Sequence, residues 1–178
     1  LISHRGNTSG RIPHLENDPD YIKNAIHLGY DVEIDVWYED GFWLGHDKPQ
    51  YKIGIGFLLT NASKLWCHAK NGQALVEMKK YGDLHYFWHQ EDDFTLTSRG
   101  FIWTYPNKLL YYNSICVLPE LGYNGDITGC HAVCSDYIEK YKEYEKASKK
   151  VGPLDQKTID RINKEEEEKM MYGGSKIK

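Results

Sequence analysis

The chain is predicted to fold as an α/β domain with about seven strands, followed by a charged, partly helical C-terminal extension. Its 178 residues, 40% of them hydrophobic and 13% aromatic, suffice for one compact core. Short apolar runs alternate with turn residues up to residue 138, and helical patterns separate the first of these runs. Strand followed by helix favours parallel pairing. Because the composition changes near residue 139, we divide the chain into residues 1–138 and 139–178.

Seven segments have the apolar, β-branched or aromatic character of strands. In chain order they are Leu1–Ser3, Asp31–Trp37, Leu65–Ala69, Leu84–Trp88, Gly100–Thr104, Ser114–Leu118 and Ala132–Cys134. A hairpin is also predicted between Trp37–Tyr38 and Phe42–Gly45, because the intervening Asp40–Gly41 pair favours a tight turn.

Two helices are predicted between the first strands. One begins at Pro19, where Asn17 or Asp18 can cap it, and ends at Gly29. The other follows Asn71 and ends at Gly82. Some later connections have only about ten residues, fewer than the dozen or so that a helical crossover requires.

Charge is distributed unevenly along the chain. Residues 139–178 carry eleven Lys or Arg and nine Asp or Glu, which leaves residues 1–138 with a net charge of −6. An acidic core argues against nucleic-acid binding. Residues 139–178 are predicted to form one or two solvated helices, divided at Gly152–Pro153 and ending at Gly173–Gly174.

The sequence predicts a cytoplasmic protein without an integral membrane segment. No apolar run approaches the roughly 20 residues that span a bilayer, and no signal-peptide pattern is visible. The cysteines are too sparse for a disulfide scaffold: Cys67, Cys116, Cys130 and Cys134. A zinc site at Cys130, His131 and Cys134 is not expected, because no second ligand pair is present.

Two carboxylates, Glu33 and Asp35, interrupt the most apolar predicted strand. Alternation places them on one face, with Val32, Ile34 and Val36 on the other. At a Cα separation of about 6 to 7 Å, two charges repel by roughly 2 to 3 kcal/mol at an effective dielectric near 20. A divalent cation, Mg²⁺ or Ca²⁺, would offset this repulsion. The alternative is an edge strand whose polar face lies in water.

Two histidines, His4 and His46, each follow an apolar run and bracket the carboxylate pair in the sequence. Imidazoles near a metal-binding carboxylate pair suit acid–base chemistry on a phosphate ester. Arg5, next to His4, is a candidate partner for the phosphate oxygens.

The order of these motifs resembles the glycerophosphodiester phosphodiesterase family, which belongs to the wider group of phosphatidylinositol-specific phospholipase C-like barrel phosphodiesterases. The matching motifs are His4-Arg5-Gly6, Glu16-Asn17, Glu33-Ile34-Asp35-Val36 and His46-Asp47, with a weaker match at Cys134-Ser135-Asp136-Tyr137. The resemblance implies a TIM-type barrel with its site at the C-terminal ends of the strands.

The resemblance also implies roles for individual residues. His4 and His46 would be the acid–base pair, and Glu33 and Asp35 would bind one divalent metal ion. Arg5 and Lys70 would contact the substrate phosphate, and Glu16 would be a carboxylate that lines or supports the site.

The sequence departs from the family pattern in two respects. His68 stands two residues before Lys70, where the family has a carboxylate ligand. An imidazole there makes Mn²⁺ or Zn²⁺ possible, and Glu120 is an alternative ligand. Since a full barrel takes about 250 residues, we expect a reduced or incomplete TIM-type (β/α) barrel.

The predicted function is a metal-dependent phosphodiesterase that hydrolyses glycerophosphodiesters or similar small head-group phosphodiesters. His89, Glu91 and Trp103 are expected to line its substrate pocket. One alternative is a catalytically silent barrel that binds phosphate esters or a protein partner. Another is a phospholipase D-like or lyase reaction on lysolipids, although the sequence shows no exposed apolar lobe for an acyl chain.

Overall fold

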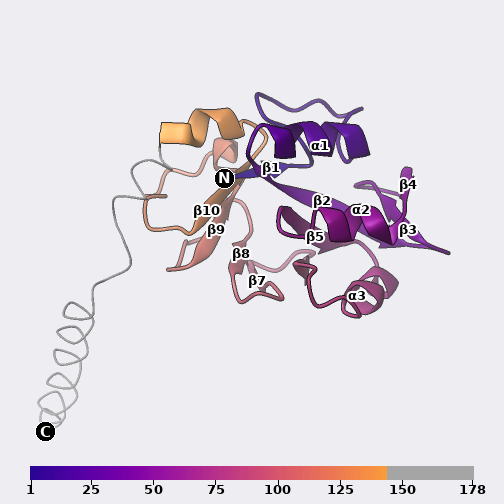
Figure 1. Cartoon of the computed structure of the whole chain (residues 1–178). Coiled ribbons are helices and arrows are strands. Elements are labelled where there is room, and N and C mark those ends of the chain that lie inside the picture. The colour runs from indigo at the N-terminus through magenta and orange to yellow at the C-terminus, as the bar shows by residue number, and fades with distance from the viewer. Residues whose placement is uncertain (144–178) are drawn as a thin grey trace, which may run out of the picture.

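The computed structural model describes residues 1–143, in which ten strands form one mixed sheet (Figure 1). The strands are β1 (Ile2–His4), β2 (Asp31–Tyr38), β3 (Phe42–Leu44), β4 (Tyr51–Ile53), β5 (Leu65–Ala69), β6 (Tyr86–Trp88), β7 (Phe94–Leu96), β8 (Ile102–Thr104), β9 (Ser114–Val117) and β10 (Ala132–Ser135). The helices are α1 (Pro19–His27), α2 (Ile55–Thr60) and α3 (Gly72–Met78), with 3-10 turns η1 (Pro119–Leu121) and η2 (Ile138–Tyr141).

Seven of the strands pair in parallel, in the order β6-β5-β2-β1-β10-β9-β8. Strands β3, β4 and β7 add antiparallel pairs beside β2 and β8. The first strand of the chain therefore lies between β2 and β10. Parallel pairing also places the C-terminal ends of the seven strands at one edge of the sheet.

The expected reduced TIM-type (β/α) barrel is wrong. That fold requires a helix after each strand, whereas residues 1–143 contain three α-helices and ten strands, three of which pair antiparallel. In Figure 1 the α-helices lie beside β1, β2 and β5, while the β7–β10 half has only 3-10 turns next to it. The connections in that half contain helix-breaking residues, such as Pro119, Gly122 and Gly125 between β9 and β10.

The two faces of the sheet bury different clusters. Val32, Ile34 and Val36 of β2 pack in the larger cluster with residues of α1, α2 and α3. The opposite face collects one or two apolar side chains from each of six parallel strands: Ile2, Trp66, Phe87, Trp103, Ile115, Val117 and Cys134. Phe87 of β6 stacks on Trp103 of β8 with ring centroids 4.5 Å apart, although these strands end the parallel ladder. The sheet therefore curls around this second cluster.

Most predicted elements are present with small changes of boundary. Leu65–Ala69 is β5, and the hairpin at Asp40–Gly41 joins β2 to β3 with positive φ at both turn residues. Asp18 caps α1 by accepting hydrogen bonds from the backbone N–H groups of Asp20 and Tyr21. Asn71 caps α3, which ends at Met78, four residues earlier than expected.

Three short elements were not predicted: β4, α2 and β7. Strand β4 has three residues and helix α2 has six, too few for either to show a clear hydrophobic period in the sequence. Turn η2 crosses the boundary drawn at residue 138. The predicted helices of the C-terminal extension lie outside the described residues. Within residues 1–143, no helix combines the length and the apolar character needed to cross a bilayer.

Candidate functional site

The candidate site lies at the C-terminal ends of the parallel strands, around a cavity of about 550 Å³. Six of the predicted site residues line it: His4, Arg5, Glu33, His46, His68 and Lys70. Asp35 is fully buried behind them. His4 and Glu33 are register partners on β1 and β2, and Asp35 is the register partner of His68 on β5. Register thus brings together residues that are up to 64 positions apart in the sequence.

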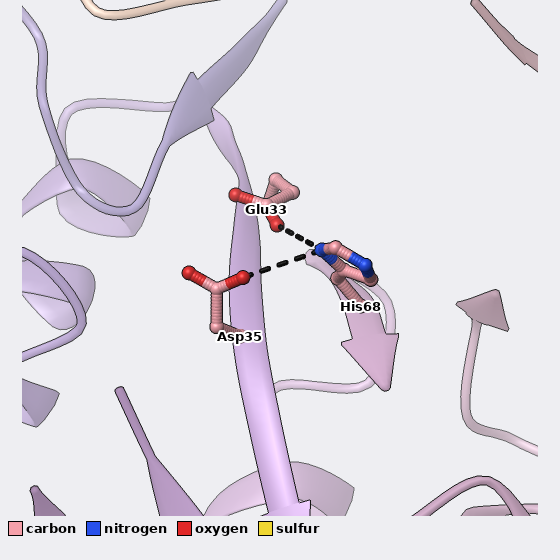
Figure 2. Close-up of side chains that lie close together, drawn as sticks. All are labelled: Glu33, Asp35 and His68. Atoms are coloured by element: carbon pink, nitrogen blue, oxygen red, sulfur yellow. Dashed lines mark ion pairs between the residues drawn. The ribbon is translucent and has the colours of Figure 1, made fainter. Parts of the chain in front are cut away.

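Glu33, Asp35 and His68 form a compact cluster (Figure 2). One ligand atom from each lies within 4.8 Å of the others. His68 Nδ1 is 3.3 Å from Asp35 Oδ1 and 3.8 Å from Glu33 Oε1. His68 Nε2 is 2.8 Å from the carbonyl oxygen of His89, which can only accept, so Nε2 carries a proton. In a neutral ring the Nδ1 lone pair would then face two carboxylates, and a proton or a metal cation between them removes that repulsion.

The two carboxylates of this cluster are in different electrostatic states. Burial raises the pKa of Asp35, but the hydrogen bond from His68 and the charges of Arg5 and Lys70 outweigh it and hold the pKa well below its usual range. Burial, followed by the charge of Asp35, raises the pKa of Glu33 above its usual range. The pair therefore concentrates negative charge on Asp35 and favours any cation that approaches Glu33.

Arg5 is held in place by two carboxylates. Its Nε is 2.8 Å from Asp35 Oδ2 and its Nη1 is 3.2 Å from Glu16 Oε2. The backbone of Arg5 has a φ of +54°, an unusual value for a residue other than glycine. Its N–H donates to the carbonyl of Glu33, and its own carbonyl accepts from the N–H of Asn17. These contacts turn the chain sharply at the end of β1 and aim the guanidinium at the carboxylates.

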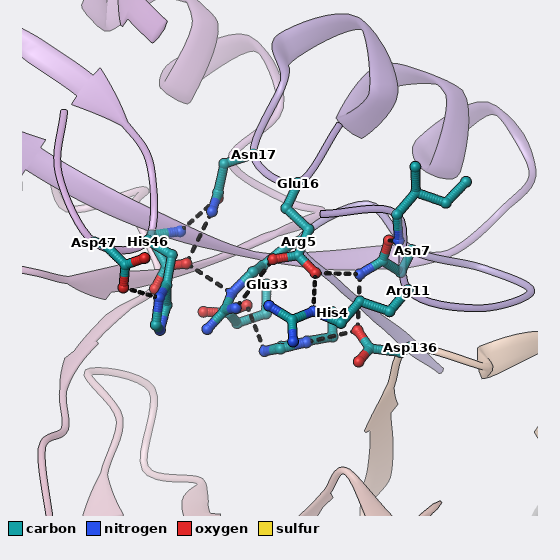
Figure 3. A network of polar contacts seen from close by, with 12 residues as sticks. His4, Arg5, Asn7, Arg11, Glu16, Asn17, Glu33, His46, Asp47 and Asp136 are labelled. Carbon is teal, nitrogen blue, oxygen red and sulfur yellow. Dashed lines mark hydrogen bonds and ion pairs between the residues drawn. The ribbon is translucent and has the colours of Figure 1, made fainter. Parts of the chain in front are cut away.

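Glu16 supports this arrangement from behind rather than facing the metal cluster. It accepts hydrogen bonds from Arg5, Arg11 and Asn7 (Figure 3). Burial raises the pKa of Glu16, but the hydrogen bond and charge of Arg11 and Arg5 bring it below its usual value. The carboxylate therefore stays charged and fixes two guanidinium groups at the cavity.

His4 is paired with Asp136, which follows β10. The distance from His4 Nδ1 to Asp136 Oδ1 is 2.8 Å, and His4 Nε2 lies 3.8 Å from Glu33 Oε2. Asp136 also accepts from the side-chain amide of Asn7 (Figure 3). Burial raises the pKa of Asp136, but these hydrogen bonds and the charge of His4 lower it overall. The sequence prediction noted the Ser135-Asp136-Tyr137 motif but did not assign Asp136 a role in the site.

His46 lies on the turn after β3 and lines the same cavity as His4. Its Nδ1 is 2.6 Å from Asp47 Oδ1, and its side chain is 41% exposed. Burial and the nearby charges of Arg5 and Lys70 lower the pKa of His46 below the ordinary histidine value. Protonated His46 is accordingly a stronger acid than an ordinary imidazolium.

Glu120, the alternative metal ligand, does not join the cluster. Its carboxylate accepts hydrogen bonds from the hydroxyl of Ser135, at 2.9 Å, and from the backbone N–H of Asp136, at 2.8 Å. Glu120 therefore orients the turn that carries Asp136. Of the three expected pocket residues, His89 and Trp103 line the cavity, whereas Glu91 is exposed and outside it.

Comparison of the chain with family models, with curated proteins and with solved structures gave no match. The chemistry of the site itself is therefore the basis for a functional assignment.

Proposed function

We propose that the protein is a metal-dependent phosphodiesterase that hydrolyses glycerophosphodiesters or similar phosphodiesters. One observation carries the proposal: a buried cluster of two carboxylates and one imidazole adjoins a carboxylate-paired histidine in a single cavity. The resemblance of the motifs around His4, Glu33 and His46 to the glycerophosphodiester phosphodiesterase family supports the same activity. The four free cysteines, three of them buried, suit a reducing compartment such as the cytoplasm.

Glu33, Asp35 and His68 have the character of a metal-binding donor set. Glu33 Oε2 and Asp35 Oδ1 are buried, and their contacts within residues 1–143 are ion pairs of 3.3 to 3.8 Å with His4, His68 and Lys70. Contacts of this length satisfy a buried carboxylate oxygen only in part, and a divalent cation would satisfy it fully. Mg²⁺ or Ca²⁺ suits the two carboxylates, while His68 also admits Mn²⁺ or Zn²⁺. When bound, the ion would polarise the phosphoryl group and offset its negative charge.

The histidines supply the proton transfers of the proposed hydrolysis. Asp136 accepts from His4 Nδ1–H, which leaves the lone pair of Nε2 free to take a proton from the attacking water. A new bond forms between the water oxygen and phosphorus as the bond from phosphorus to the leaving alcohol breaks. His46 donates its proton to the departing alkoxide, so one water yields a phosphomonoester and an alcohol.

Arg5 and Lys70 supply positive charge for the phosphate oxygens. Both line the cavity, and both are anchored by Asp35, Lys70 through an Nζ–Oδ1 distance of 3.5 Å. A guanidinium that is held by carboxylates before substrate arrives loses little conformational entropy on binding.

Release of glycerol phosphate from glycerophosphocholine and its relatives tests the proposal. We expect EDTA to abolish the activity and one of Mg²⁺, Mn²⁺, Ca²⁺ or Zn²⁺ to restore it. Glu33→Gln and His4→Ala should each lower kcat at least a hundredfold, because the first weakens the metal site and the second removes the base. His27→Ala, which changes an exposed histidine of α1, is the matched control and should keep full activity.

The proposal would be contradicted if the same diesters bound saturably but gave no product with any of the metals. The protein would then be a binding module for phosphate esters.

A further inference from the structure

The cavity has two chemically different sides. The charged side holds the groups described above, at the ends of β1, β2 and β5. The other side is formed at the ends of β6, β8 and β9. Its polar members are His89 and Gln90, which follow β6, and the rest are apolar or aromatic: Trp88, Trp103, Tyr105, Pro106, Val117, Leu118 and Leu121. We call this second side the apolar wall.

The apolar wall runs from the interior of the cavity to the surface of the molecule. At its inner end, Trp103 and Val117 are 4% and 8% exposed. At its outer end, Tyr105 is 43% exposed and Leu121 is 59% exposed, and both still line the cavity. A ligand that followed the wall would therefore pass from the phosphate end of the cavity to solvent along apolar side chains.

The backbone at Leu118 supports a functional reason for the wall. Leu118 has a φ of +47° and a ψ of +55°, a left-handed conformation that is unfavourable for a leucine. Its N–H donates to the carbonyl of Cys134 at 2.7 Å, and Pro119 follows it into turn η1. This turn brings both Leu118 and Leu121 to the cavity. Strain of this kind is characteristically retained at ligand-binding sites.

We propose that the substrate is an amphiphilic phosphodiester with a single aliphatic chain, as in a lysophospholipid, and that this chain lies along the apolar wall. The inference rests on the proposed function and names its substrate class. The charged side matches a phosphate and the apolar wall matches a hydrocarbon chain, so the cavity is complementary to both parts of such a molecule. Apart from His89 and Gln90 at the end of β6, a polyol or a second charged group would meet few hydrogen-bonding partners along the wall.

The test uses glycerophospho-n-alkyl esters with methyl, butyl, hexyl and octyl chains, below their micelle concentrations. Both hydrolysis and equilibrium binding are measured on the full chain with the restoring metal. We expect kcat/KM and affinity to rise by about threefold per methylene while the chain contacts the wall. Leu121→Ser should lower the octyl-to-methyl ratio about tenfold. The matched control is Leu96→Ser, which changes a leucine of similar exposure, 68%, outside this cavity.

The outcomes separate this inference from the proposed function. Equal kcat/KM for all chain lengths would overturn the inference and leave the hydrolase intact. If no ester is hydrolysed with any metal, the proposed activity fails. The binding series alone then decides whether the apolar wall binds the aliphatic chain. Affinity that rises with chain length and falls in Leu121→Ser would then still support the chain-binding wall, whereas flat affinity would refute it. An equal loss in Leu96→Ser would also refute it.

Discussion

Each histidine of the proposed acid–base pair has its own carboxylate, but the two carboxylates come from very different places in the sequence. Asp47 directly follows His46, whereas Asp136 is 132 residues from His4. The Asp136 carboxylate accepts from both His4 and Asn7, and Glu120 holds its backbone N–H. One orientation of His4 is thereby fixed by residues from both ends of the described chain.

Asp136→Asn should lower kcat about a hundredfold or more and change KM less than threefold. The amide is nearly isosteric but removes the negative charge that fixes the His4 tautomer, so Nε2 becomes a poorer base. Steady-state kinetics with glycerophosphocholine or the octyl ester measures the effect. Asp126→Asn is the control, at an exposed aspartate whose hydrogen bonds within residues 1–143 are with Thr128. An unchanged kcat in Asp136→Asn would exclude Asp136 as a positioning residue.

Single residues of the site were predictable where the neighbouring sequence indicates their role. Glu33 and Asp35 stand out because two charges on one face of an apolar strand need an explanation, and the structure places both beside His68. Asp136 could not be assigned in the same way, because nothing near it in the sequence indicates a partner. Glu120 was placed wrongly as an alternative ligand, since only the turn geometry shows that it accepts from Ser135 and Asp136.

At the scale of elements, the turn between β3 and β4 determines where His46 lies. Gly45 has a φ of +149°, and its N–H donates to the carbonyl of Asp35 at 3.2 Å. Its carbonyl accepts from the indole N–H of Trp37. A Cβ at this position would collide with the backbone carbonyl oxygen of Lys48. Only glycine therefore fits between β2 and this turn.

Gly45→Ala should destabilise the protein by about 2 kcal/mol or more and displace His46, so activity should fall as well. Urea unfolding and hydrolysis rates measure the two effects. Gly54→Ala is the matched control, because Gly54 has a φ of −86° and nothing lies within 4 Å of its added Cβ. Equal stability of the two variants would show that the turn tolerates a side chain.

Helices and strands were predictable where their sequence pattern is long and clear. The capped helix after Asp18 and the strand Leu65–Ala69 show clear signals and are present. The expectation of a reduced TIM-type barrel failed because it came from a family resemblance and not from the residues themselves. The connections after β6 are too short or too rich in turn residues to form crossover helices.

At the scale of the whole molecule, the core contains a histidine that has no part in the proposed chemistry. His85 is 2% exposed, lies against Trp66 with ring centroids 4.1 Å apart, and bonds to the hydroxyl of Thr97 at 2.8 Å. Burial, together with the charge of Arg99, lowers the pKa of His85 to about 4. The folded protein therefore keeps this ring neutral under conditions that protonate it in the unfolded chain.

The free energy of unfolding should fall as the pH is lowered from about 6.5 to about 4, with His85 contributing roughly 3 kcal/mol. The unfolded state binds more protons in this interval, so stability rises with pH across it. His85→Gln should be less sensitive to pH than the wild type in urea unfolding at a series of pH values. His14→Gln, at an exposed histidine, should follow the wild type. Parallel curves for wild type and His85→Gln would contradict the assignment.

The curl of the sheet was not predictable from the sequence. Alternation shows which residues share a face, but it does not show that Phe87 and Trp103, on the terminal strands of the parallel ladder, would stack. That contact brings together β6 and β8, whose ends both contribute to the lining of the cavity. The curl of the sheet follows from the long-range order of the strands.

The place of β1 between β2 and β10 has a consequence for synthesis on the ribosome. His4 is among the first residues to emerge, but its partner Asp136 is translated only after all ten strands. A growing chain therefore has an incomplete catalytic pair and a bare edge on its first strand until residues 132–136 are free to dock. Under the proposed mechanism the nascent protein should be inactive during this interval, and the exposed strand edge should favour chaperone binding.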